Sequence, residues 1–212
     1  MLLVHGLNDT NLVFQKMSAY LAALGWSVYD LNLIPCNGNL SLECLAQQVA
    51  DCIAATFAPE QPIDLIGFSM GGVVSRYYVQ RLGGLDRVHR FITVAAPNHG
   101  TLTAYASYRP GCMQMRPDSL FLQDLNRDAT RLEQLNFTSI WTPFDLMIIP
   151  ASSSQMPVGR DVKLDILTHP WMLTDPRSLE AVVAALQEPL RQNRPLVHSG
   201  DRQKSPQPDS KT

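Results

Sequence analysis

Short apolar runs alternate with segments of helical periodicity along the first hundred residues of the chain. Apolar residues fill four runs of strand length, and between these runs they recur every three or four positions. Glycine or proline follows each periodic segment and ends it. The predicted strands are 1–4, 26–31, 63–68 and 88–95, and the predicted helices are 12–24, 42–57 and 73–82. This alternation predicts an α/β protein with a mostly parallel sheet of about six strands and helices on both faces.

The second half of the chain has a looser pattern. Prolines at 110 and 117 interrupt the segment 101–136, in which we expect one short helix around 119–125 and which we interpret as a cap or substrate loop. Further apolar runs predict strands at 137–142 and 165–167, and helical periodicity predicts a final helix over 176–190. A composition rich in Ser, Pro, Gln and Lys follows. We therefore expect one α/β domain over 1–191 and a disordered tail over 192–212.

A serine stands in a glycine-rich turn between the predicted strand 63–68 and the helix that follows it. The turn reads Gly67-Phe68-Ser69-Met70-Gly71. A serine in such a turn adopts strained backbone geometry, and the flanking glycines remove the bulk that would keep the strand and helix apart. The Met70 amide opens the helix and directs an unpaired donor at negative charge developing beside Ser69. Ser69 is therefore the candidate nucleophile.

A serine hydroxyl needs a base within hydrogen-bond reach, and the chain contains five histidines. His169 follows the last predicted strand and has a downstream helix to anchor its loop, so it is the candidate base. We interpret the two histidines that follow other strands as structural. His5 would donate to the neighbouring backbone and shape the first loop, and His99 would brace the helix behind Ser69.

The base needs an acid that fixes its tautomer. Asp145 comes just beyond a predicted strand and is surrounded by apolar residues, where a carboxylate requires a partner. Asp161 and Asp165 are the alternatives. Because ligands bind beyond the carboxyl ends of parallel strands, we expect Ser69, Asp145 and His169 to gather at one rim of the sheet.

These motifs resemble the α/β-hydrolase superfamily, and within it the small class 2 bacterial lipases and esterases. The resemblance covers about residues 1–190 and implies a minimal α/β-hydrolase fold that lacks the first two strands of larger relatives. It also implies that Ser69, Asp145 and His169 form a catalytic triad and that the backbone amides of Leu7 and Met70 form an oxyanion hole. The residues that carry it are Val4-His5-Gly6-Leu7, Gly67 to Gly72, Ala96-Pro97-Asn98-His99-Gly100-Thr101, Asp145 and His169.

The composition of the chain restricts which partners it could bind and where in the cell we expect it. Apolar residues make up 45% of the chain and the formal charge is −2, which argues against nucleic-acid binding and against attraction to anionic membranes. No run is long enough for a membrane span and no signal-peptide pattern opens the chain, so we expect a cytoplasmic protein without a stable membrane anchor. Transient contact with a lipid surface remains compatible with an apolar pocket rim. The first strand begins at Met1 itself, which favours a natural reading frame that starts further upstream.

Several other side chains have structural interpretations. The four cysteines lack metal-ligand spacing, so we expect free buried thiols, with Cys44 and Cys52 packed in a helix, and no metal. Arg76 is expected on a solvated or ion-paired face of the helix behind Ser69. One apolar group in the loose segment is assigned to the core rather than to an acyl pocket: Met113, Met115, Leu120, Phe121 and Leu122.

Together these features predict a serine carboxylic-ester hydrolase that acts on acyl lipids or acylglycerols through an acyl-enzyme. Ser69 would attack the carbonyl, His169 would take its proton and later activate water, and Asp145 would orient His169. This chemistry needs no cofactor. Two alternatives stay open: acyl transfer at the same site, and a non-catalytic binding protein built on the same fold.

Overall fold

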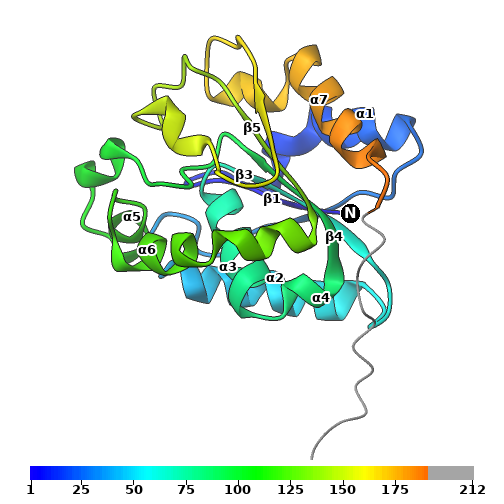
Figure 1. Cartoon of the computed structure of the whole chain (residues 1–212), viewed down its shortest axis with the longest axis horizontal. Coiled ribbons are helices and arrows are strands. Elements are labelled where there is room, and N and C mark those ends of the chain that lie inside the picture. The colour runs from blue at the N-terminus through cyan, green and yellow to red at the C-terminus, as the bar shows by residue number, and fades with distance from the viewer. Residues whose placement is uncertain (191–212) are drawn as a thin grey trace, which may run out of the picture.

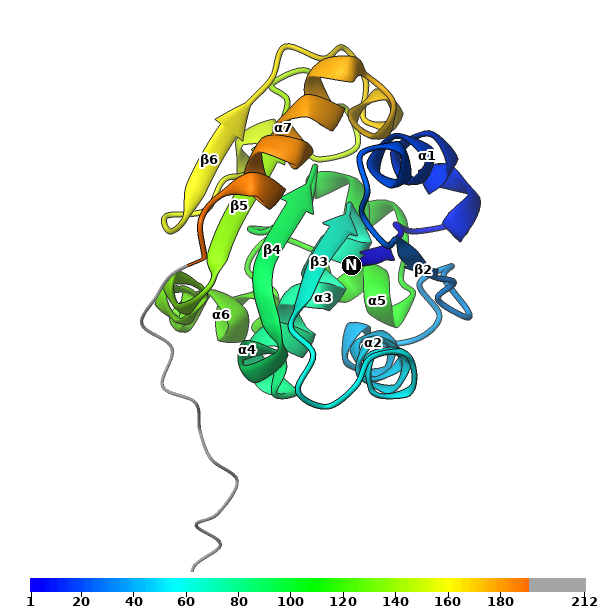
Figure 2. The ribbon, with the colours of Figure 1, turned by 90° about the vertical axis from the view of Figure 1, so that its right-hand side faces the viewer.

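The computed structural model describes residues 1–190, and a six-stranded parallel sheet forms their centre (Figures 1 and 2). Every neighbouring pair of strands is parallel. In spatial order the strands are β2 (Tyr29–Leu31), β1 (Leu2–Val4), β3 (Ile63–Phe68), β4 (Val88–Val94), β5 (Asn136–Trp141) and β6 (Arg160–Lys163). The predicted α/β class with about six strands is confirmed. The predicted tail over 192–212 lies outside the described residues.

Helices cover both faces of this sheet, as the alternating pattern predicted (Figures 1 and 2). On one face lie α1 (Gln15–Ala23) and α7 (Pro176–Gln187), and on the other lie α2 (Leu42–Thr56), α3 (Met70–Arg81) and α4 (Gly84–Arg87). Successive side chains of a strand point to opposite faces, so Leu2 and Val4 belong to the core under α2 and α3, whereas Leu3 belongs to the core under α1 and α7. The sheet is buried on both sides.

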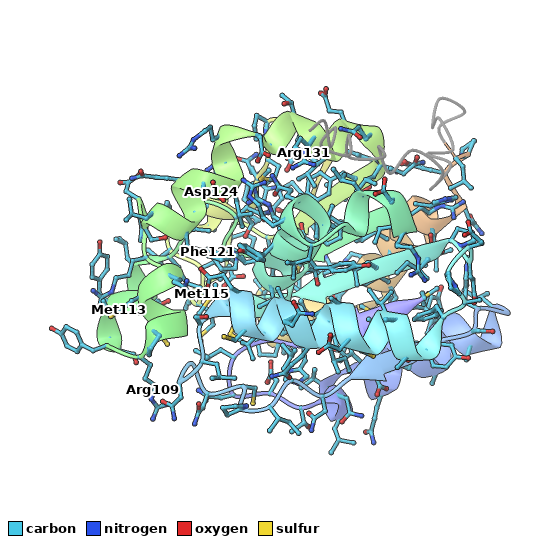
Figure 3. The ribbon with its side chains drawn as sticks, turned by 90° about the horizontal axis from the view of Figure 1, so that it is seen from below. Arg109, Met113, Met115, Phe121, Asp124 and Arg131 are labelled. Carbon is cyan, nitrogen blue, oxygen red and sulfur yellow. The ribbon has the colours of Figure 1, made fainter. Side chains whose placement is uncertain are left out.

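The segment 101–136, which we call the cap segment, contains more regular structure than its sequence predicts. Instead of one helix around 119–125 it holds four short helices: η2 (Leu102–Ala106), α5 (Pro110–Gln114), α6 (Leu120–Arg127) and η3 (Ala129–Gln134). Pro110 starts α5 at a position where its missing N–H costs nothing, and the Ser119 hydroxyl accepts from the Leu122 amide to cap α6. Figure 3 shows the cap segment along one side of the molecule, marked by Arg109, Met113, Met115, Phe121, Asp124 and Arg131.

Short 3-10 helices complete the connections outside the cap segment: η1 (Asn11–Phe14), η4 (Ala151–Ser154) and η5 (Pro170–Leu173). The predicted strand at 165–167 is wrong, because the last strand is β6 at Arg160–Lys163. β6 is an edge strand with mostly exposed side chains, so its sequence has no apolar run. Ile166 is apolar because it is buried in the loop beyond the strand.

The expectation of buried cysteines holds only in part. All four thiols are free, but Cys44 is exposed, Cys36 and Cys52 are half-buried and Cys112 is buried. The apolar group of the cap segment also divides. Phe121 and Leu122 are buried in the core as predicted, whereas two of its members, Met113 and Leu120, are exposed.

Candidate active site

Ser69 stands at the sharp turn between β3 and α3, with φ 53° and ψ −126°. A non-glycine residue in this region is strained by about 1–3 kcal/mol, so the surrounding structure must hold it there. The Ser69 amide does so in part by donating to the Val94 carbonyl of β4 at 2.9 Å. A Cβ at Gly67 would stand 2.5 Å from the Gly72 Cα, so only glycine permits this close passage of strand and helix. The turn is the one that the sequence predicts.

His169 and Asp145 form a buried pair at the same end of the sheet. The Nδ1 atom of His169 lies 2.7 Å from Oδ2 of Asp145, and both side chains are almost completely buried. The other carboxylate oxygen accepts from the Met147 amide at 2.8 Å and the Ile148 amide at 2.9 Å. Three donors therefore fix the carboxylate, and the carboxylate fixes the imidazole with its other nitrogen available as a proton acceptor.

The two alternative acids lie elsewhere. The Asp161 carboxylate accepts from the indole N–H of Trp141 at 3.1 Å, and Asp165 is an exposed residue. Within residues 1–190, Asp145 is the carboxylate that bonds to His169. The geometry therefore favours Asp145 over Asp161 and Asp165 as the partner of the histidine.

Two backbone amides next to Ser69 have no protein acceptor. Leu7 and Met70 line one cavity together with Ser69, and within residues 1–190 neither amide donates a hydrogen bond. His5 holds the loop that carries Leu7, because its Nδ1 lies 2.9 Å from the Gly6 carbonyl and its Nε2 accepts from the Leu33 amide at 2.9 Å. Accepting at Nε2 places the proton on Nδ1, so His5 is a neutral bridge, in agreement with its predicted structural role.

The cavity in front of Ser69 has a volume of about 600 Å³ and is lined mostly by apolar side chains. His169 lies in its wall, as does Thr101 at the start of the cap segment. The apolar lining includes Phe68, Ala104, Met115, Ile148 and Leu173. Met115 is thus a cavity residue as well as a buried one, whereas the sequence favoured the core over an acyl pocket.

Three loops that line this cavity also expose large apolar side chains to solvent. Tyr108 is 83% exposed and Leu146 is 78% exposed. Further exposed members of these loops are Leu102, Tyr105, Phe144, Met147, Leu167 and Trp171. The guanidinium of Arg116 lies 4.8 Å from the ring centre of Tyr105 and 5.2 Å from that of Tyr108, which orders the two tyrosines. An apolar rim therefore surrounds an apolar cavity.

The expectation for Arg76 is wrong, because its side chain is completely buried. Its guanidinium donates to the Asn98 carbonyl at 3.1 Å, to the Leu125 carbonyl at 3.2 Å and to Asn126 Oδ1 at 3.0 Å. Burial lowers the pKa of Arg76 to about 9, since few charges compensate it there. Arg76 thus joins α3 to the turn after β4 and to α6.

His99 contacts the cap segment rather than α3. The Nδ1 atom of His99 lies 3.2 Å from the side-chain amide nitrogen of Asn126. The pKa of His99 is lowered, first by burial and then by the charge of Arg76. The bracing of α3 that the sequence assigned to His99 comes instead from Asn98, through Arg76. His99 is not part of the cavity wall.

Asp9 is the cavity residue that the sequence reasoning missed. It lies in the loop after β1, two positions beyond Leu7, and its side chain lines the cavity with Ser69. Its position just past the carboxyl end of a parallel strand was the available signal. Within residues 1–190, no group of three or more His, Cys, Asp or Glu side chains could hold a metal ion.

The parallel six-stranded sheet with a serine turn at its carboxyl edge is the α/β-hydrolase fold, which solved lipases share. The chain belongs to the palmitoyl protein thioesterase family, whose model matches residues 1–130. That match includes the loop of Leu7 and the turn of Ser69, and it ends before Asp145 and His169.

Solved structures share the fold at low sequence identity. Lipase B of Aspergillus fumigatus superposes with a TM-score of 0.74 and 19% identity over 91% of this chain and 53% of that one. The mature lipase BlEst2 of Bacillus licheniformis gives 0.71 and 13% over 87% and 90%. An extracellular α/β-hydrolase of a Paenibacillus species gives 0.63 and 19% over 87% and 97%. The chain spans about half the length of the Aspergillus lipase.

Proposed function

We propose that this protein is a serine hydrolase that cleaves esters or thioesters of long acyl chains. The observation that carries the proposal is the 2.7 Å contact between His169 and Asp145, in a cavity that also contains Ser69 and two unpaired amides. A nucleophile, a base with an orienting acid and a pair of oxyanion donors are the parts that acyl transfer needs.

In the proposed reaction the Ser69 oxygen attacks the carbonyl carbon while His169 takes the hydroxyl proton. The Leu7 and Met70 amides hold the negative oxygen of the tetrahedral intermediate. When that intermediate collapses, the bond to the leaving alcohol or thiol breaks and His169 gives it the proton. A water molecule then loses a proton to His169 and attacks the acyl-enzyme, which releases the acid and restores Ser69.

An acyl substrate is supported by the walls of the cavity. A volume of about 600 Å³ with a mostly apolar lining suits a hydrocarbon chain, and the apolar rim suits transient contact with a lipid surface. The two lipases named above share this fold. No helix within residues 1–190 has the length and hydropathy needed to cross a membrane.

The family name points to thioesters of palmitoylated proteins, a substrate class that the sequence alone did not suggest. Esters and thioesters share the attack on the carbonyl and differ in the leaving group, because a thiolate departs more readily than an alkoxide. The proposal therefore includes both, and acyl transfer is the variant in which an alcohol or thiol replaces water in the second step.

The test measures hydrolysis of p-nitrophenyl esters of short and long acyl chains, and of a palmitoyl thioester, by the wild type, Ser69→Ala and His169→Ala. We expect wild-type activity and a loss of at least about a thousandfold in both variants. Ser152→Ala removes an exposed hydroxyl outside the cavity and is the matched control, expected to keep full activity. If no substrate is cleaved and a fluorophosphonate does not label Ser69, the non-catalytic binding protein replaces this proposal.

A further inference from the structure

Asp9 places a carboxylate beside the candidate nucleophile. Gly6 lies between them, and a Cβ built on it would be 3.0 Å from Oδ2 of Asp9 and 3.4 Å from the Ser69 oxygen. The glycine thus leaves open a small space that the Asp9 carboxylate and the Ser69 side chain both border. A substrate carbonyl that approaches Ser69 comes close to this carboxylate.

The loop that carries Asp9 is held on both sides. The Asn8 amide donates to the Cys36 carbonyl at 2.9 Å, and the Cys36 thiol lies 3.0 Å from the Asp9 carbonyl, to which it donates. These contacts use the backbone of Asp9 and leave its side chain in the wall of the cavity. The position of the carboxylate is therefore set by the fold.

Asp9 has few ionisable neighbours in the cavity wall. Among residues 1–190, no lysine or arginine lines the cavity, and its other acid–base groups are His169 and the Cys112 thiol. Burial raises the pKa of Asp9 above its ordinary value, and a hydrogen bond from the Gly6 backbone partly offsets this rise. Asp9 is half-buried, so water still reaches its carboxylate. Within residues 1–190, a negative charge on this carboxylate meets no permanent cation in the cavity wall.

We propose that Asp9 makes the site select by charge, so that it accepts acyl substrates with neutral or cationic groups near the scissile bond and disfavours anionic ones. The inference rests on the proposed hydrolase function and adds a substrate preference to it. Charges a few ångströms apart in a partly dehydrated cavity interact by more than they would in water. Neutral acyl esters and acylated thiols would be accepted, and substrates that bring a phosphate or carboxylate into the cavity would be rejected.

The experiment compares three p-nitrophenyl esters of similar acyl length. The valerate ends in a methyl group, the glutarate monoester ends in a carboxylate, and the 4-(trimethylammonio)butyrate ends in a quaternary ammonium. The quantity compared is the ratio of kcat/KM for each charged ester to that for the valerate, after subtraction of the uncatalysed rate. A general loss of activity cancels in this ratio. We expect the wild type to use the glutarate monoester about tenfold less efficiently than the valerate.

Asp9→Asn removes the charge and keeps the shape. We expect it to raise the glutarate ratio about tenfold and to lower the ammonium ratio by a similar factor. The control is Asp118→Asn, which removes an exposed carboxylate outside this cavity, at a positive φ that asparagine tolerates. We expect it to keep both wild-type ratios.

Two results would overturn the inference while leaving the proposed function intact. One is a wild type that cleaves the valerate and the glutarate monoester equally well, which needs no variant and so does not depend on the folding of Asp9→Asn. The other is an Asp9→Asn protein with wild-type ratios. If the wild type cleaves none of the esters or thioesters, the protein is not the proposed hydrolase. That result overturns the proposed function together with the inference.

Discussion

The two faces of the sheet are covered in different ways. On the face of α1 and α7 the contact is apolar, with Met17 and Leu21 of α1 and Leu179 and Val182 of α7 packed on the strands. On the other face α3 packs on the cap segment through apolar side chains, such as Tyr77 on Phe121, and it also bonds to that segment through polar ones. Apolar packing tolerates small changes one at a time, whereas a buried polar network loses several hydrogen bonds with a single change.

The polar contact runs along three residues of α3. Arg76 bonds to the turn after β4 and to α6, and the Gln80 amide donates to the Leu125 carbonyl at 2.8 Å. Arg81 pairs with Asp124 and Asp128, each at 2.8 Å. From Arg76 to Arg81 the contacts become more exposed. Substitutions along this line should therefore cost progressively less.

Arg76→Met should have the largest effect. It removes the buried donor of three hydrogen bonds, to the Asn98 and Leu125 carbonyls and to Asn126 Oδ1, so we expect a loss of about 3–5 kcal/mol in the free energy of unfolding, measured with urea. Arg127→Met changes an exposed arginine of α6 and should cost less than about 0.5 kcal/mol. Equal losses in the free energy of unfolding for Arg76→Met and Arg127→Met would contradict a stabilising role of the buried hydrogen bonds of Arg76.

Leu179→Ala tests the apolar face. Leu179 is buried in the core under α1 and α7, and its truncation should cost about 2–4 kcal/mol through lost contacts and a residual cavity. Glu180→Ala on the exposed side of the same helix should be nearly neutral. A cost for Leu179→Ala below that of Glu180→Ala would show that α7 is not held by this packing.

Arg81→Lys should have a smaller effect of about 1 kcal/mol. Lysine keeps the charge but loses the planar donors that reach both aspartates, and the pair is partly exposed. The difference from the wild type should shrink when urea unfolding is repeated at high salt. A difference that stays the same at high salt would assign the role of Arg81 to packing.

Asp128→Asn should have the smallest effect of the four, present at neutral pH and lost in acid. Burial raises the pKa of Asp128, but hydrogen bonds from Arg81 and Arg131 outweigh it and hold the pKa below the ordinary 3.8. Such a group stabilises the fold above the pKa of the unfolded chain, and this contribution is lost as the pH falls through the folded pKa. The unfolding midpoint of the wild type should therefore fall more steeply below about pH 4 than that of Asp128→Asn. If the unfolding midpoints of the wild type and Asp128→Asn fall equally with pH, the ionised Asp128 carboxylate does not stabilise the fold.

The fold was largely predictable because its main signal is local. The buried strands Leu2–Val4 and Ile63–Phe68 are mostly apolar runs, and a helix such as Leu42–Thr56 has an apolar side. β6 was misplaced because an edge strand such as Arg160–Lys163 needs no apolar run. Arg76 was misinterpreted because its partners, Asn98 and Leu125, are far from it in the sequence, and periodicity carries no information about them.

The candidate site could be predicted from the sequence in part, because the carboxyl ends of parallel strands meet at one edge of the sheet. Ser69 and His169 follow different strands, and the parallel topology brings both to one cavity. The choice of Asp145 over Asp161 needed the structure, because only the contact with His169 separates the carboxylates. The short helices of the cap segment are set by their packing on α2, on α3 and on one another, so their sequence predicted only one of them.

One residue, Met147, connects the cap segment to the acid of the candidate site. The Met147 carbonyl accepts from the hydroxyls of Thr101 and Thr103, at 2.9 and 2.7 Å, while the Met147 amide donates to Asp145. A displacement of the cap segment at Thr101 would therefore pull on the carboxylate that orients His169. Met147 therefore links the entrance of the cavity to the orientation of His169. A substitution that displaces the cap segment would also misalign the histidine that we propose as the base.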